Sequence, residues 1–127
     1  MDAKERKERP VFTGVLKYFP DAIMEVAKVS LAGNQQHHPD KPLHWDRAKS
    51  TDELDALSRH LIDAGKIDDD GQLHSAKVAW RALANLQKEL EDRKKENVDH
   101  IIAGTESAYI LDNDSTTDNK DPFNQTQ

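Results

Sequence analysis

Cysteine is absent from the 127-residue chain, and its absence excludes three kinds of chemistry. The protein has no disulfides, no thiolate metal site and no cysteine nucleophile. A secreted scaffold held together by disulfides is therefore excluded. Any metal ion would have to bind through oxygen or imidazole ligands, which the 24 acidic residues and six histidines supply.

Long apolar runs are absent as well. No segment approaches the roughly 20 consecutive apolar residues that cross a membrane. The charged N-terminal sequence MDAKERKERP also lacks the apolar stretch of a signal peptide. We therefore expect no membrane partner and a cytoplasmic location.

Positive charge is in deficit, since the net charge is −6. A protein that neutralises many phosphates needs a basic surface, so general nucleic-acid binding is not expected. Apolar residues make up 35% of the chain and charged residues 33%, and the length suits one domain. Such a composition supports only a thin hydrophobic core, which leads us to expect a homodimer.

Strong catalytic motifs are missing too. The chain contains no Walker A loop, no HExxH, no HD dipeptide and no GxSxG. Motif spacing alone therefore leaves the function open.

The composition changes twice along the chain. Residues 1–9 carry alternating charges and no apolar residue apart from Met1 and Ala3, which predicts a flexible N-terminus. Residues 10–96 hold the periodic apolar segments and form the predicted domain. Residues 97–127 form a polar and largely disordered tail, with disorder expected after about residue 112.

The N-terminal half of the domain predicts one helix between two irregular segments. The dense apolar run of residues 11–19 contains Gly14 and ends before Pro20, so we interpret it as an irregular anchor laid over the core. Residues 21–31 predict a helix that Gly33 caps. Residues 34–49 contain two prolines and no helical period, and long loops of this kind are often functional.

The C-terminal half predicts two helices. Ser50 followed by Glu53 fits a capping box, and a stripe of leucines, which are Leu54, Leu57 and Leu61, continues the helix toward Gly65. A second helix is predicted over residues 73–94, and its apolar stripe consists of Ala76, Ala79, Trp80, Leu83, Leu86 and Leu90. The Asp-rich turn between the helices, residues 65–71, is too short for any arrangement except an antiparallel helix pair. The expected fold is an all-α domain with an irregular N-terminal anchor, a long polar loop and this helix pair.

Several polar residues could carry chemistry. The antiparallel pairing brings His60 and His74 to the same end of the two helices. His74, Lys77 and Arg81 share one helical stripe, and two cations near a helix N-terminus favour a phosphate. Trp45, in the polar loop, is either a core residue or a platform for a nucleobase. Exposed charges such as Lys77 are often merely solvated, so both interpretations stand at this point.

Short groups of residues in a fixed order suggest a family. They are Phe19-Pro20-Asp21-Ala22, Glu25-Val26-Ala27, Gly33-Asn34, His44-Trp45, Arg59-His60-Leu61, Asp69-Asp70-Gly71, His74-Ser75-Ala76 and Ala79-Trp80. Over roughly residues 10–95 the chain resembles the phage and bacterial dATP/dGTP diphosphohydrolase N-terminal domain family. That family is loosely similar to the all-α, MazG-like nucleotide pyrophosphohydrolases.

The resemblance implies a metal-dependent hydrolysis of purine deoxynucleoside triphosphates to monophosphate and pyrophosphate. It implies catalytic roles for His60 and His74, and Mg²⁺ or Mn²⁺ held by Glu25 and Asp70. We assign nucleotide binding to Trp45, Arg59, Lys77 and Arg81, of which Lys77 and Arg81 are chosen for their charge alone. The chain departs from the paired ExxE and ExxD acids of active all-α pyrophosphatases, because its first long helix offers only Asp21 and Glu25.

A different class of function is therefore kept open. The same site could bind a nucleotide or a cyclic nucleotide without cleaving it, as a phage counter-defence protein in the host cytoplasm would. Turnover that depends on a divalent metal would separate the enzyme from the binding module.

Overall fold

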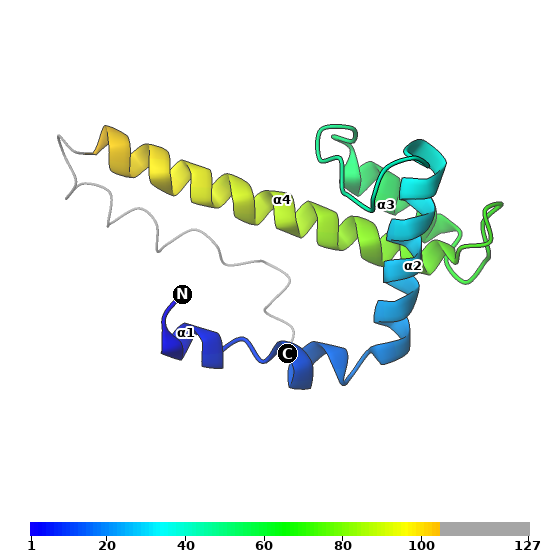
Figure 1. Ribbon diagram of the computed structural model, residues 1–127, viewed down its shortest axis with the longest axis horizontal. Coiled ribbons are helices and arrows are strands. Elements are labelled where there is room, and N and C mark those ends of the chain that lie inside the picture. The colour runs from blue at the N-terminus through cyan, green and yellow to red at the C-terminus, as the bar shows by residue number, and fades with distance from the viewer. Residues whose placement is uncertain (105–127) are drawn as a thin grey trace. The chain divides into compact units, whose positions relative to one another are not determined.

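A computed structural model describes residues 1–104 of the chain, and its regular elements are helical. Their order is α1 (Ala3–Lys7), the π-helical turn η1 (Phe12–Leu16), α2 (Pro20–His37), α3 (Glu53–Ile62) and α4 (His74–Ala103) (Figure 1). Between residues 1 and 104 the only β-type pairing is a single antiparallel bridge that joins Ile67 to Leu73. The expected all-α class is confirmed.

The chain divides into two compact units, Met1–Leu86 and Gln87–Gln127, which are described separately. The first unit contains α1, η1, α2, α3 and the first turns of α4. In the second, the described part is the rest of α4, which ends at Ala103 and passes the end predicted at Lys94. Disorder after residue 112 concerns residues that lie outside the described part. None of the described helices is long and apolar enough to cross a membrane.

The N-terminal segment is helical in two short pieces. In α1, Asp2 and Glu5 form a reciprocal capping box, with hydrogen bonds of 2.8 and 2.7 Å between each side chain and the other's backbone N–H. No residue of α1 is buried, and the flexibility of residues 1–9 stays a prediction. In η1, the N–H of Lys17 donates to the carbonyl oxygen of Phe12 at 2.8 Å.

The expectation that residues 11–19 anchor the core is wrong. The segment is a helical turn rather than irregular, and its large side chains are exposed: Val11, Phe12, Val15, Leu16, Tyr18 and Phe19. The turn follows Pro10, whose carbonyl oxygen accepts a hydrogen bond from the N–H of Gly14 at 2.7 Å. Local hydrogen bonds stabilise the conformation of this segment, and its apolar side chains remain exposed.

Helix α2 is longer than predicted. Pro20 stands at its first turn, where a missing N–H costs nothing. Gly33 does not cap the helix, because among residues 1–104 only Gly65 and Gly71 have positive φ. The helix continues to His37 because buried Asn34 holds the following loop. Its Nδ2 donates to the carbonyl oxygen of Lys41 at 3.1 Å, and its Oδ1 accepts from the N–H of His44 at 3.3 Å.

The start of α3 also differs from the prediction. Asp52 is the N-cap and its side chain makes no capping hydrogen bond, so the Ser50–Glu53 capping box is wrong. Ser50 Oγ donates to Asp52 Oδ1 at 3.0 Å instead. The carboxylate of Glu53 turns inward and accepts a hydrogen bond from Arg81 of α4 at 2.8 Å. A contact between helices has replaced the local cap.

The faces that α3 and α4 bury are not the leucine stripes. Leu54 and Leu61 are more than half exposed, whereas Glu53 and Ala56 are buried. On α4 the buried residues are Ala76 and Ala84, while Leu83, Leu86 and Leu90 are about half exposed. Alanine lets helix backbones approach closely, so the alanines mark where the helices pack. The expectation that the leucine stripes form the core is wrong.

A tight loop, residues 63–73, joins α3 to α4. Gly65 and Gly71 adopt φ of 89° and 80°, which residues with a Cβ rarely adopt. The N–H of Asp68 donates to the carbonyl oxygen of Gln72 at 2.8 Å, which closes the loop. The first residue of α3 contacts α4 two turns from its start, and His60 near the end of α3 contacts His74. The two helices are therefore antiparallel, as predicted.

Candidate functional site

A cleft of about 560 Å³ lies within the unit Met1–Leu86. Side chains of α2, α3, the start of α4 and the two intervening loops surround it. The residues that matter for its chemistry are His38, Trp45, Glu53, His60, Asp70, Gln72, Lys77, Trp80 and Arg81. A volume of this size is typical of clefts that bind small molecules.

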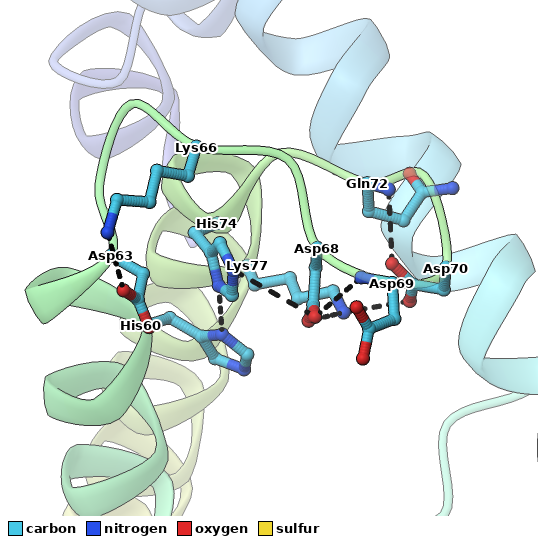
Figure 2. A network of polar contacts seen from close by, with 9 residues as sticks. All are labelled: His60, Asp63, Lys66, Asp68, Asp69, Asp70, Gln72, His74 and Lys77. Atoms are coloured by element: carbon cyan, nitrogen blue, oxygen red, sulfur yellow. Dashed lines mark hydrogen bonds and ion pairs between the residues drawn. The ribbon is translucent and has the colours of Figure 1, made fainter.

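His60 and His74 meet at one end of this cleft. Their Nδ1 atoms lie 2.9 Å apart, a hydrogen-bond distance, and their ring centroids are 5.2 Å apart (Figure 2). One Nδ1 must carry a proton and the other must accept it, because two N–H groups or two lone pairs would repel. Burial lowers the pKa of His60, and the positive charge of Lys77 lowers it further. The pair cannot be doubly protonated in this arrangement.

Beside the histidines, the ammonium of Lys77 lies between two carboxylates. Its Nζ is 2.6 Å from Asp68 Oδ2 and 2.7 Å from Asp70 Oδ2 (Figure 2). Burial opposes the charge on Lys77, but the hydrogen bonds to both carboxylates outweigh it and raise its pKa. The same hydrogen bonds lower the pKa of Asp68 and of Asp70. All three groups are therefore charged near neutral pH.

Asp68, one of the two carboxylates that bind Lys77, also lies close to the histidine pair. Its Oδ1 lies 3.9 Å from Nε2 of His74, whose side chain is only 13% exposed. His60, Asp68 and His74 each offer one atom able to bind a metal, and these three atoms lie within 4.8 Å of one another. The arrangement offers two imidazoles and a carboxylate, with a fixed cation beside them.

Two aromatic rings line the other part of the cleft. Trp45 and Trp80 meet edge to face, with centroids 5.9 Å apart and planes at 82°. The guanidinium of Arg47 lies 4.3 Å from the centroid of the Trp45 ring. The Nε1 of Trp80 donates to Ser30 Oγ on α2. The loop tryptophan therefore belongs to an aromatic wall rather than to a hydrophobic core.

Arg81 stands between this wall and α3. Its Nη1 donates to Glu53 Oε2 at 2.8 Å and to Ser50 Oγ at 3.1 Å. Its guanidinium carbon lies 5.5 Å from the centroid of the Trp80 ring. Glu53 is buried, so this ion pair fixes the position of Arg81 in the cleft wall.

Most of the residues proposed from the sequence come together here. Trp45, His60, Asp70, Lys77 and Arg81 line the cleft. His74 contacts His60 from behind.

Two of the proposed residues lie elsewhere. Glu25 is on α2, outside the set of residues that line the cleft. Arg59 is largely exposed and pairs with Asp52 at 3.0 Å, also outside that set.

Sequence reasoning missed three residues of the site. Asp68 belongs to the Asp-rich turn, where composition indicated nothing beyond a turn. Glu53 was interpreted as part of a helix cap. Gln72 is buried and its Oε1 has no hydrogen-bond partner in the part of the chain that the structure describes. The geometry of the loop brings Asp68 and Gln72 there, and no spacing rule reports it. Glu53 lies two turns before His60 on α3, so helical spacing could have connected these two residues.

Comparison with known protein families gives a match over most of the chain. The family model described as "dATP/dGTP diphosphohydrolase, N-terminal" matches residues 2–99. No curated protein and no solved structure matches the chain significantly.

Proposed function

Because the chain belongs to the dATP/dGTP diphosphohydrolase N-terminal domain family, we propose that its cleft binds a purine deoxynucleoside triphosphate and hydrolyses it to monophosphate and pyrophosphate. The observation that carries the proposal is the composition of the cleft. An aromatic wall, the cations Lys77 and Arg81, and His60 of the histidine pair line one volume of about 560 Å³. These are the groups that a base, a polyphosphate and an attacking water require.

The aromatic wall suits the nucleobase. Trp45 and Trp80 offer apolar ring surface against which a base can pack. This part of the cleft supports binding of a nucleobase, and the family suggests that the base is a purine.

The cations suit the phosphates. Lys77 and Arg81 both line the cleft, and each already pairs with carboxylates. This pairing fixes both cations in place, so they can stabilise charge that develops on leaving pyrophosphate without reorganising. Arg59 lies outside the cleft and has no role in this proposal.

A divalent metal, Mg²⁺ or Mn²⁺, would neutralise the triphosphate and lower the pKa of an attacking water. Asp70 fits the role of ligand in part, because its carboxylate lines the cleft. Its Oδ2 accepts from Lys77 and its Oδ1 from the N–H of Gln72, so each oxygen has one lone pair left. Glu25 lies outside the cleft lining, so the contacts give it no part in holding the metal.

The test is direct. The purified protein is incubated with each of the four deoxynucleoside triphosphates and with Mg²⁺, Mn²⁺ or a chelator, and the products are resolved by ion-exchange chromatography. We expect the monophosphate and pyrophosphate from dATP or dGTP, and none with the chelator. His74→Ala should abolish this turnover, whereas His100→Ala, far along α4, should not change it. Binding of no nucleotide at all would overturn the proposal.

One observation favours the second candidate, a nucleotide-binding module without hydrolysis. Lys77 and Arg81 are already neutralised by Asp68, Asp70 and Glu53, which weakens their attraction for a phosphate. Nucleotide or cyclic-nucleotide binding without product in any metal condition would favour this module over the enzyme.

A further inference from the structure

The contacts of His60 and His74 are asymmetric, and the asymmetry determines where their protons lie. Each ring has one nitrogen in the contact between the two Nδ1 atoms, at 2.9 Å. The remaining nitrogens have different surroundings. Nε2 of His74 faces Asp68 Oδ1 at 3.9 Å. Nε2 of His60 has no hydrogen-bond partner among residues 1–104. His60 lines the cleft.

Two neutral arrangements of the pair are compatible with one shared proton. In the first, His60 donates its Nδ1–H to His74, whose own proton is then on Nε2. In the second, His74 donates, and its Nε2 presents a lone pair to the Asp68 carboxylate. The second arrangement places a lone pair against a negative charge, so Asp68 selects the first.

Asp68 is held in place to do this. Lys77 binds its Oδ2 at 2.6 Å, and its Oδ1 accepts the N–H of Asp69 at 2.7 Å (Figure 2). Lys77 also binds Asp70 on its other side, so the carboxylate of Asp68 has little freedom to turn. The fixed carboxylate determines which ring nitrogen of His74 carries the proton, and His74 in turn determines this for His60.

We propose that Asp68 and His74 are positioning residues that fix the tautomer of His60, so that His60 Nε2 is an unprotonated base open to the cleft. Figure 2 shows that this nitrogen lies on the side of the His60 ring away from His74. The lowered pKa of His60 supports the assignment, because it keeps the ring neutral at neutral pH.

The catalytic part of the proposal rests on the proposed hydrolysis. His60 Nε2 accepts a proton from a water molecule. The water oxygen forms a bond to phosphorus, and the phosphoanhydride bond between the α- and β-phosphates breaks. The electron pair of that bond stays on the bridging oxygen of the departing group. Asp68 and His74 touch no reacting atom, and they act only through His60.

The tautomers are measured first, without nucleotide. Long-range ¹H–¹⁵N spectra of the full chain distinguish a protonated ring nitrogen from a bare one, and His60→Ala and His74→Ala assign the signals. We expect His60 to carry its proton on Nδ1 and His74 on Nε2. A proton on Nε2 of His60 overturns the proposal.

A pair of variants then tests Asp68. An asparagine can turn its amide toward Nε2 of His74 and donate to it, so Asp68→Asn should reverse both tautomers. Asp70→Asn is the matched control, since it removes the other carboxylate on Lys77 and should leave both tautomers unchanged. Reversal in both variants, or in neither, overturns the role of Asp68. Should Asp68→Asn fail to fold, the spectrum of the unmodified protein still decides.

Two further measurements complete the test. Stoichiometric Zn²⁺ or Mn²⁺ that perturbs both histidine signals in the absence of nucleotide would make the pair a metal site and overturn the proposal.

Where hydrolysis is observed, Asp68→Asn should lower kcat by about 100-fold or more and remove the acidic limb of its pH profile, with little change in KM. Asp63→Asn, on the same loop, should do neither. Absence of hydrolysis with the predicted tautomers contradicts the proposed function and leaves the tautomer assignment intact.

Discussion

Glu53 shows how a single charged residue can replace a hydrophobic contact. Its carboxylate is buried at the start of α3 and accepts a hydrogen bond from Arg81 of α4 at 2.8 Å. Removing one partner of such a pair strands the other, and the stranded charge costs more than the pair itself contributes. The pair therefore specifies how α3 and α4 meet, at the position where the sequence suggested only a helix cap.

Glu53→Ala should lower the free energy of unfolding by about 2–3 kcal/mol, because it leaves a partly buried guanidinium without its carboxylate. Urea unfolding followed by circular dichroism measures this loss. Asp55→Ala, an exposed acid of the same helix, is the control and should stay within about 0.5 kcal/mol of the unmodified protein. Equal losses in the two variants would contradict a specific role for the buried pair.

His38 predicts a pH dependence of stability. Burial lowers its pKa below the usual 6.5, and the nearby charges of His44, Lys49 and Lys41 lower it further, against a smaller opposite effect of Asp46. Above pH 6.5 the ring is neutral in both the folded and the unfolded chain. Below it the unfolded chain binds a proton that the folded chain does not, so the free energy of unfolding falls until the folded pKa is reached.

His38→Asn should flatten this dependence. Unfolding in urea at about pH 7 and about pH 5 gives the loss of stability on acidification for each protein. We expect a smaller loss in His38→Asn, whereas His37→Asn, its exposed neighbour, should lose as much as the unmodified protein. An identical loss in all three proteins would show that His38 titrates normally.

At the site, the sequence predicted the residues that local geometry connects. His60 and His74 were expected at the same end of an antiparallel pair because the link between the helices is short, and their Nδ1 atoms do meet. Asp68 could not be predicted, because its position depends on how residues 63–73 close. That closure is made by backbone hydrogen bonds and two glycines with positive φ, which no helical periodicity reports.

Among the elements, α2 shows why helix ends are harder to predict than helices. Its start follows from Pro20, and its interior from ordinary helix formers. Its end was placed at Gly33 because glycine commonly caps helices. The helix passes this glycine because Asn34, one residue later, binds the following loop, and a tertiary contact of that kind has no signature in local sequence.

Gly33→Ala should therefore stabilise the protein. Gly33 lies inside α2 with a negative φ, and an added Cβ would meet nothing within 4 Å. We expect the free energy of unfolding to rise by about 0.5–1 kcal/mol, because alanine loses less backbone entropy on folding. Thermal or urea unfolding measures the change.

Gly71→Ala is the opposite control. At φ 80° an alanine is strained whatever space surrounds it, so this variant should lose about 1 kcal/mol or more. Destabilisation by Gly33→Ala would instead indicate that Gly33 has a special backbone role after all.

At the scale of the whole molecule, the notable feature is how little apolar surface the chain buries. In the described residues, the buried hydrophobic side chains are three alanines, which are Ala56, Ala76 and Ala84. Several large apolar side chains are more than half exposed, among them Phe12 of η1, Leu61 of α3 and Leu83 of α4. The sequence composition anticipated a thin core, and it could not show which face would remain uncovered, since the leucine stripes were the natural candidates for burial.

These exposed side chains support the expected homodimer. Leu83, Leu86 and Leu90 recur at spacings of three and four residues along α4, and each is about half exposed. Residues with this spacing share one face of a helix, and pairing with the same face of a second chain would remove them from water.

Light scattering should therefore give about twice the chain mass of 14.4 kDa at tens of micromolar. Leu86→Glu should shift the mass to that of a monomer, because a charge at the centre of such a contact is desolvated without a partner. Lys95→Glu, an exposed position on the opposite face of the same helix, is the control and should keep the dimer. A monomeric mass for the unmodified protein, with a melting temperature that does not change with concentration, would contradict the dimer and leave this face exposed in a single chain.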